Sequence, residues 1–199
     1  MENMNEMFNN STENSVYVEG SEEEKPKFVP IEPGEYTGHI KEYSSRVVEW
    51  TDKNGDSFKA RVHNYKVELA DNDNKEFNGR IFRSNGCFQF LEPKEGDKFI
   101  SNQSGNKSYL RFCEDVGIDC AEVEREVDGE TIKVKQLPNI EEKDVLGVPV
   151  IAVLNFGKAY EDKNGYTKKP MQVKFIKKWA DGERLDVKTT KELEDDIPF

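Results

Sequence analysis

The stretch RVVEWTDKNGDSFKARVHNYKVEL, residues 46–69, decides the fold class of this chain. Two runs rich in β-branched and aromatic residues flank the dipeptide Asn54-Gly55. Asn-Gly between such runs is the strongest short signal for a β-hairpin, because a type I′ turn needs positive φ at both central residues. The run after the turn, residues 58–69, is long for one strand, so we expect it to bend or to carry a bulge.

Further β-signals lie on both sides of this hairpin. A second hairpin is predicted to turn at Asp128-Gly129, as an excursion within residues 119–139. A closing hairpin lies within residues 148–179, and its turn at residues 162–165 repeats the letters DKNG of residues 52–55. The flanks of the two turns differ, so we interpret the repeat as reuse of a favoured turn. Short strands are also predicted at residues 36–40, 80–84 and 87–91.

One segment in the middle of the chain has helical periodicity. The sequence GNKSYLRFCEDVGID, residues 105–119, is predicted to form a helix that stops at Gly117. A short helical turn is expected after Pro138, in EEKDVLG. The apolar residues that recur at helical spacing in the first helix are Tyr109, Leu110, Phe112, Cys113 and Val116.

The order of these elements predicts a mainly β protein. A small antiparallel barrel with one helix between its third and fourth strands is the five-stranded OB arrangement. We therefore expect an OB-fold-like barrel with one or two short helices. A split antiparallel sheet packed on one helix is the alternative.

The charge of the chain is concentrated at its ends. The net charge is −11, and the first 24 residues contain seven acids and no Lys or Arg. We expect residues 1–27 to be a disordered acidic segment, residues 28–182 to be the folded domain and residues 183–199 to be a flexible acidic tail. The sequence has no apolar run of transmembrane length and no signal peptide, which predicts a cytoplasmic protein.

Motifs for catalysis or metal binding are absent from the sequence. It contains no GxxxxGK phosphate loop, no HExxH and no GxSxG, so we do not expect an enzyme or a cofactor. The three cysteines form no CxxC pair, and there are only two histidines. No metal site is expected from this set.

Basic and aromatic residues alternate on two predicted strands. In residues 58–69, alternation places Lys59, Arg61, His63 and Tyr65 on one face, and Phe58 on the other with Ala60 and Val62. Single-stranded nucleic-acid binders combine basic groups for the phosphates with flat aromatic platforms for unstacked bases. Solubilising lysines beside buried aromatics are the alternative reading of this pattern.

The closing hairpin carries most of this basic character. Alternation predicts that Met171, Val173 and Phe175 point inward, and that Gln172 and Ile176 point outward with the lysines around them. The residues that we select as a candidate DNA-binding site across both strands are Lys59, Arg61, Tyr65, Lys158, Tyr160, Tyr166, Lys168, Lys169, Lys174, Lys178 and Trp179.

The last five residues are DDIPF. They are identical to the tip of bacterial single-stranded-DNA-binding proteins, in which an acidic tail docks on replication and repair proteins. The resemblance implies that Phe199 enters an apolar pocket and that its carboxylate meets a basic group at the rim. Pro198 and Ile197 would hold the peptide extended, and Asp195 and Asp196 would meet further basic groups.

The body resembles phage- and prophage-encoded single-stranded-DNA-binding proteins found with recombination functions. The bacterial protein's own N-terminal motif is missing, and the excursion around VDGETIKVK departs from the compact form. The segments that carry the resemblance are PGEYTGHI, the first hairpin, FNGRIFRSN, YLRFCEDVGID, DVLGVPVIAVL and DKNGYTKKPMQVKF, in that order across residues 33–175.

These observations lead to one main hypothesis and two alternatives. The main hypothesis is a sequence-independent single-stranded-DNA-binding protein of phage replication, recombination and repair, which recruits partner enzymes through its tip. One alternative is an acidic decoy that occupies host docking sites without binding DNA, and the other is an annealing accessory of a recombinase. On a tether that starts near Gly182, the tail acids would also compete with DNA for the closing hairpin.

Overall fold

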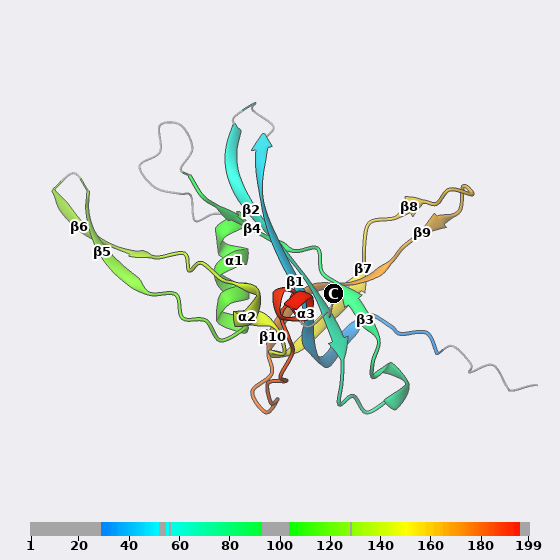
Figure 1. Ribbon diagram of the computed structural model, residues 1–199. Coiled ribbons are helices and arrows are strands. Elements are labelled where there is room, and N and C mark those ends of the chain that lie inside the picture. The colour runs from blue at the N-terminus through cyan, green and yellow to red at the C-terminus, as the bar shows by residue number, and fades with distance from the viewer. Residues whose placement is uncertain (1–28, 52–54, 56, 93–103, 128, 196–199) are drawn as a thin grey trace, which may run out of the picture. The chain divides into compact units, whose positions relative to one another are not determined.

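The computed structural model describes residues 29–51, 55, 57–92, 104–127 and 129–195. The chain divides into a unit of residues 1–30 and a unit of residues 31–199, and the second unit is the subject below. Its described residues are mainly β and its sheets are antiparallel, as the sequence predicts (Figure 1).

The elements follow one another in the predicted order. The strands are β1 (Gly34–Thr51), β2 (Ser57–Leu69), β3 (Ile81–Arg83), β4 (Cys87–Phe90), β5 (Glu122–Val127), β6 (Glu130–Lys135), β7 (Pro149–Phe156), β8 (Tyr160–Glu161), β9 (Thr167–Lys168) and β10 (Met171–Lys178). The helices are α1 (Ser104–Asp115), α2 (Glu142–Val145) and α3 (Thr190–Asp195), with a 3₁₀ turn η1 (Lys75–Phe77).

Strand β1 joins the two halves of the main sheet. Its first part pairs with β7 and the remainder pairs with β2, so the sheet runs in the order β10-β7-β1-β2-β3, with β4 also on β2. The predicted hairpin of residues 46–69 is confirmed on both sides of its turn. Gly55 has φ of 91°, and Asn54 lies outside the described residues. The ladder pairs Thr51 with Ser57, a register that leaves an odd number of residues between the strands and does not fit the predicted two-residue type I′ turn at Asn54-Gly55.

The expected bulge does not lie in the long second strand itself. The β1–β2 ladder has no shift within residues 57–66, and the shift lies in β1, between Ile40 and Glu42. Instead, the inward face of β2 changes along the strand: Phe58 and Ala60 are buried near its start, and His63 and Tyr65 farther on. Lys59, Arg61, His63 and Tyr65 share one face of the strand, as predicted, but the core covers only the second half of that face, so His63 and Tyr65 are buried while Lys59 is exposed.

Strand β10 also changes face, at Lys174. The ladder with β7 shifts between Val173 and Phe175, so two residues that are three positions apart, Val173 and Ile176, are both fully buried. Phe175 is only partly buried, and the guanidinium of Arg111 lies 4.9 Å from its ring centroid. The predicted inward set therefore fails after Val173, because a bulge moves every later side chain to the other face.

Helix α1 covers the core at the place where the sequence predicts it. All five of its apolar residues are buried, and Gly117 ends it with φ of 83°. The core otherwise comes from β1, β2, β4, β7 and β10, with Ile140 and Val145 added from the segment around α2. No helix in the described part of the chain is long and apolar enough to cross a membrane.

A polar network occupies the core beneath α1. The Nδ1 atom of the fully buried His63 lies 2.6 Å from the hydroxyl of Tyr43, and its Nε2 lies 3.3 Å from Oε1 of Gln89. A neutral ring satisfies both contacts if Tyr43 donates to Nδ1 and Nε2 donates to Gln89. The ring stacks on Tyr109 at 4.6 Å, and both Tyr109 and Gln89 donate to the carbonyl of Pro138. The network thus ties the excursion back to the core.

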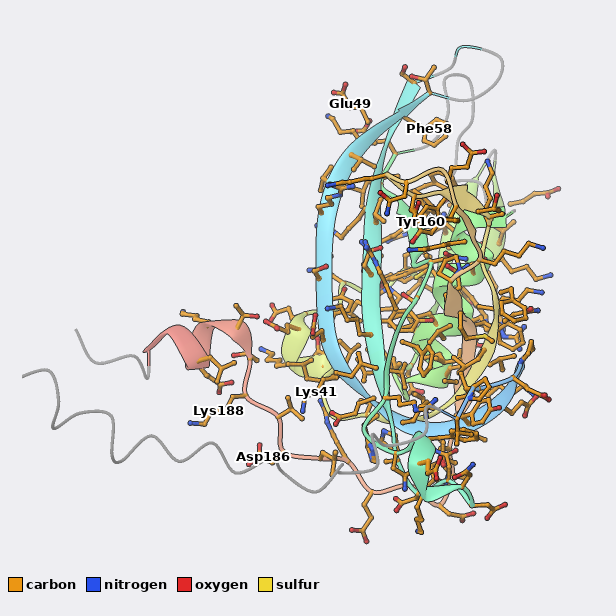
Figure 2. All side chains as sticks on the ribbon, turned by 90° about the vertical axis from the view of Figure 1, so that its right-hand side faces the viewer. Lys41, Glu49, Phe58, Tyr160, Asp186 and Lys188 are labelled. Atoms are coloured by element: carbon orange, nitrogen blue, oxygen red, sulfur yellow. The ribbon has the colours of Figure 1, made fainter. Side chains whose placement is uncertain are left out.

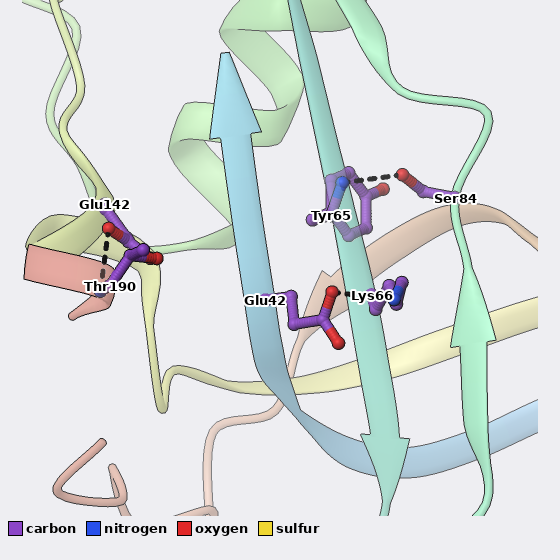
Figure 3. A network of polar contacts seen from close by, with 6 residues as sticks. All are labelled: Glu42, Tyr65, Lys66, Ser84, Glu142 and Thr190. Atoms are coloured by element: carbon purple, nitrogen blue, oxygen red, sulfur yellow. Dashed lines mark hydrogen bonds and ion pairs between the residues drawn. The ribbon is translucent and has the colours of Figure 1, made fainter. Parts of the chain in front are cut away.

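The segment after β10 is held on the body, although the sequence assigns it to a flexible tail from residue 183. The amide of Leu185 donates to the Gly147 carbonyl at 2.9 Å, and Arg184 donates to the Leu146 and Lys143 carbonyls. The hydroxyl of Thr190 then donates to Glu142 of α2 at 2.8 Å (Figure 3). We call residues 183–190 the C-terminal strap.

Acid should destabilise the fold through His63. Burial lowers the pKa of this ring to about 4, whereas in the unfolded chain it is near 6.5. Between these values the unfolded state binds the proton more strongly, so stability falls as the pH falls. We expect the His63 contribution to the unfolding free energy to drop by about 2 kcal/mol between pH 7.5 and pH 5. Urea unfolding at the two pH values measures it.

The control for this prediction is His63→Gln, which keeps a polar side chain but cannot titrate. Between pH 7.5 and pH 5, the unfolding free energy of this variant should fall by about 2 kcal/mol less than that of the wild type. Equal pH dependence in both proteins would contradict the prediction. NMR titration of the His63 ring in the wild-type protein gives the same answer without a substitution.

A second stability prediction concerns the strap. Gly147 has φ of 71°, and a Cβ there would lie 2.0 Å from the carbonyl oxygen of Leu185. Gly117 has φ of 83° with nothing within 4 Å of its Cβ position. Gly117→Ala should therefore cost only the strain of the left-handed backbone, about 1 kcal/mol, and Gly147→Ala should cost clearly more because it also displaces the strap. Equal losses in urea unfolding would mean that the strap is not packed on Gly147.

Candidate nucleic-acid interface

The β7–β10 hairpin continues past the main sheet as a two-stranded extension. The pairs Tyr160–Lys168 and Glu161–Thr167 form the short β8–β9 ladder, and the amide of Gly157 donates to the Pro170 carbonyl at 2.8 Å below it. Figure 1 shows β8 and β9 extending away from β7 and β10. We call residues 155–174 the basic arm.

Asp162 organises the turn of the basic arm. Its Oδ1 accepts hydrogen bonds from the amides of Asn164 at 2.9 Å and Tyr166 at 3.0 Å, and its Oδ2 lies 2.7 Å from the ammonium of Lys168. Lys168 and the amides lower the pKa of this carboxyl. Gly165 supplies the positive φ of 79° that the turn needs. The letters DKNG at residues 162–165 thus encode a turn with its own side-chain cap.

Exposed aromatic rings gather on this arm. Phe156 is 54% exposed, Tyr160 52% and Tyr166 69%. Within the part of the chain that the structure describes, these are the only aromatic side chains classed as exposed. Rings that their own chain leaves more than half exposed are suited to stack on another flat group.

The lysines of the basic arm are exposed as well. Lys168 is the cross-strand partner of Tyr160 and pairs with Asp162. The remaining lysines of the arm have no ion-pair partner among the described residues, and the acids of the arm are Glu161 and Asp162. These unpaired lysines are Lys158, Lys163, Lys169 and Lys174.

Trp179 does not join the aromatics of the arm. It lies at the other end of β10, half-buried beside His39 with the ring centroids 5.6 Å apart. The register pairs Met171 with Phe156 at the arm and Lys178 with Val150 at this far end. Eight strand residues at about 3.3 Å each separate the two ends, so one short site cannot include both. Lys178 is exposed but belongs to the far end too.

Lys59 and Arg61 are on β2 and are engaged by local partners. Lys59 forms an ion pair with Glu92 at 3.2 Å, and Arg61 donates to the side chain of Asn139. Arg61 also lines a pocket of about 380 Å³ between β1 and α2, which Glu141 and Glu142 line from the α2 side. Lys59 is exposed and Arg61 is partly buried. The carboxylates of Glu92, Glu141 and Glu142 nearby would repel a phosphate, so these two residues form a poor phosphate site.

Tyr65 is not available for stacking on a base. It is 6% exposed, its ring stacks on Phe112 of α1 at 5.0 Å, and burial raises the pKa of its hydroxyl. Its amide donates to Ser84 at 3.1 Å, which fixes the strand beside β3 (Figure 3). Tyr65, selected from the sequence as a DNA-binding residue, is therefore not placed to stack on a base, because the change of inward face along β2 buries it.

Two residues near the arm were not selected from the sequence. The exposure of Phe156 follows from its position opposite Met171 at the edge of the main sheet. The exposed Arg83 precedes Ser84, which forms a parallel bridge with Val173. This bridge brings β3 beside the base of the arm. No local signal in the sequence indicates that contact.

The predicted partner-docking tip lies mostly outside the described residues. Asp195 ends α3, and nothing is described for residues 196–199. In the described part of the chain, no group of three or more His, Cys, Asp and Glu side chains is placed to hold a metal ion.

Comparisons of this chain with protein-family models, with curated proteins and with solved structures found no match.

Proposed function

We propose that this protein binds single-stranded DNA without sequence preference, through the basic arm. The observation that carries the proposal is the gathering of the exposed aromatics of the described chain on one lysine-rich ribbon. Tyr160 and Tyr166 supply platforms for unstacked bases, and Phe156 supplies a third at the base of the arm. Lys158, Lys169 and the other unpaired lysines meet the phosphates.

The proposal favours single strands over duplexes for a physical reason. Stacking on an aromatic ring needs a base that is not already stacked on its neighbours, and each such contact is worth about 1–3 kcal/mol. Duplex DNA offers only its phosphates to the same arm. The basic arm contains no Arg, the side chain that most often reads base edges, which supports binding without sequence preference.

We further propose that the body is an OB-fold-like barrel. Strand order, the position of α1 between β4 and β7, and the parallel bridge between Ser84 and Val173 support it. In an OB-fold the connection between the fourth and fifth strands helps to bind oligonucleotides. The basic arm is the connection between β7 and β10, which would be those two strands.

The role in phage DNA replication, recombination and repair, and partner recruitment through the DDIPF tip, rest on the resemblance described above. The decoy and the annealing accessory remain the alternative functions. The basic arm favours DNA binding over the decoy, because a protein that only displays an acidic tip has no use for unpaired lysines beside exposed aromatics.

The aromatic part of the proposal predicts a large loss of affinity when two rings are removed. Tyr160→Ala with Tyr166→Ala should weaken binding to labelled oligo-dT by at least about thirtyfold in fluorescence anisotropy. The matched control is Tyr160→Phe with Tyr166→Phe, which keeps both rings and should bind like the wild type. Normal affinity in the alanine pair would remove these rings from the site. No oligo-dT binding by the wild type at low salt would overturn the proposal and leave the decoy.

The lysine part predicts a change in salt dependence. Replacing Lys158, Lys169 and Lys174 by Gln removes three phosphate contacts, so the slope of log affinity against log salt should become shallower by about 2. Lys107→Gln is the matched control, because Lys107 is exposed on α1 and has no ion-pair partner among the described residues. An unchanged slope in the triple variant would place the phosphates elsewhere on the protein.

A further inference from the structure

The β5–β6 hairpin forms a sheet of its own. Its ladder runs without a register shift from the pair Glu122–Lys135 to the pair Val127–Glu130, and the amide of Gln136 extends it to the Ala121 carbonyl at 2.8 Å. Neither strand is paired with another strand of the described chain on its outer edge. Figure 1 shows it as a ribbon that extends away from the main sheet. We call residues 122–135 the charged ribbon.

The two faces of the charged ribbon differ. Opposite residues of an antiparallel pair share a face, so Val123 and Val134 lie on one face with Ile132. These three side chains are only partly buried and are not part of the hydrophobic core or packed against it. A two-stranded ribbon with an uncovered apolar strip is marginally stable in water, so a further strand would stabilise it.

The other face separates the charges by strand. Glu124 and Glu126 on β5 lie opposite Lys133 and Thr131 on β6. Lys135, at the base, forms an ion pair with Glu114 of α1 at 3.1 Å, while Glu124, Glu126 and Lys133 have no ion-pair partner among the described residues. On this face the outer edge of β5 is therefore acidic and the outer edge of β6 is basic. On the apolar face, Arg125 of β5 and Glu130 of β6 carry the opposite charges.

The positions of these charges favour one way of pairing the charged ribbons of two copies. Pairing β5 with β5 of another copy would set Glu against Glu, and pairing β6 with β6 would bring the lysines together. Pairing β5 with β6 of another copy repeats the pairs that the ribbon already makes, Glu124 with Lys133 and Val123 with Val134. Each contact leaves one acidic and one basic edge free for the next copy.

We propose that the charged ribbon is a self-association surface, on which β5 of one copy pairs with β6 of a second copy. The contact joins two different edges, so it repeats as an open chain of molecules and does not close as a two-fold dimer. The ribbon is separate in sequence from the basic arm, and association through it does not need DNA. On a single strand, the same contact would make neighbouring molecules bind cooperatively.

Sedimentation equilibrium without DNA tests the proposal. The average mass of the wild type should rise above that of one chain as concentration increases. Glu124→Lys with Glu126→Lys, and separately Thr131→Glu with Lys133→Glu, should each associate about tenfold more weakly, because like charges then face each other across the contact. Both variants leave Lys135 and its Glu114 partner unchanged.

Mixing the two variants supplies the decisive measurement. The basic β5 of one then meets the acidic β6 of the other, so an equimolar mixture should recover the wild-type association. The chain with all four substitutions restores opposite charges within its own ribbon and should associate with itself like the wild type. A ribbon weakened internally by the charge reversals would not be rescued by mixing.

Two outcomes overturn the proposal. One is a wild-type mass that stays at one chain at every concentration. The other is association that survives replacement of residues 122–135 by Gly-Gly, which joins the hydrogen-bonded residues Ala121 and Gln136 directly. Neither outcome depends on DNA, so failure here leaves the proposed function untouched, and failure of oligo-dT binding leaves this test intact.

Discussion

The body of the protein depends on the absence of a side chain at Gly38. At this residue β1 pairs with Leu69 of β2 on one edge and with Val150 of β7 on the other. A Cβ at Gly38 would lie 2.4 Å from the carbonyl oxygen of Glu68, so glycine is what lets both partners close on β1. After His39, β1 no longer pairs with β7, and its only strand partner is β2. One glycine therefore joins the first hairpin to the hairpin that carries the basic arm.

Features with local causes could be predicted from the sequence. The hairpins follow from their turn residues, and α1 follows from its apolar spacing and from Gly117. The faces of the strands could not be predicted beyond a few residues, because one bulge reverses the alternation after it. Because of the bulge at Lys174, Ile176 is buried in the core in place of Phe175. No residue type in this segment predicts the bulge. The bridge from Ser84 to Val173 joins residues 89 positions apart and has no local signal either.

In the candidate site, too, some features could be predicted from the local sequence and others depend on tertiary contacts. The exposure of the lysines of the basic arm could be predicted from the sequence, because Lys is almost never fully buried unless it is paired. The aromatics could not be sorted in this way. Tyr65 and Tyr160 both lie on strands with basic neighbours, yet Phe112 of α1 covers Tyr65. Tyr160, labelled in Figure 2, is 52% exposed. Whether a ring stacks within its own chain or on a ligand depends on tertiary neighbours, which periodicity does not reveal.

The C-terminal strap changes how the acidic tail and the basic arm can interact. A tether that starts at Gly182, as the sequence suggests, would give the tail acids a high effective concentration near the β7–β10 hairpin. The strap instead carries the chain to Glu142 of α2, near the start of β7, whereas the arm leaves the end of the same strand at Phe156. Attraction between the acids and the lysines would have to release the Thr190 and Arg184 hydrogen bonds before it could act. The strap thus favours separate action of the two regions in the proposed function, in which the arm binds DNA and the DDIPF tip docks on other proteins.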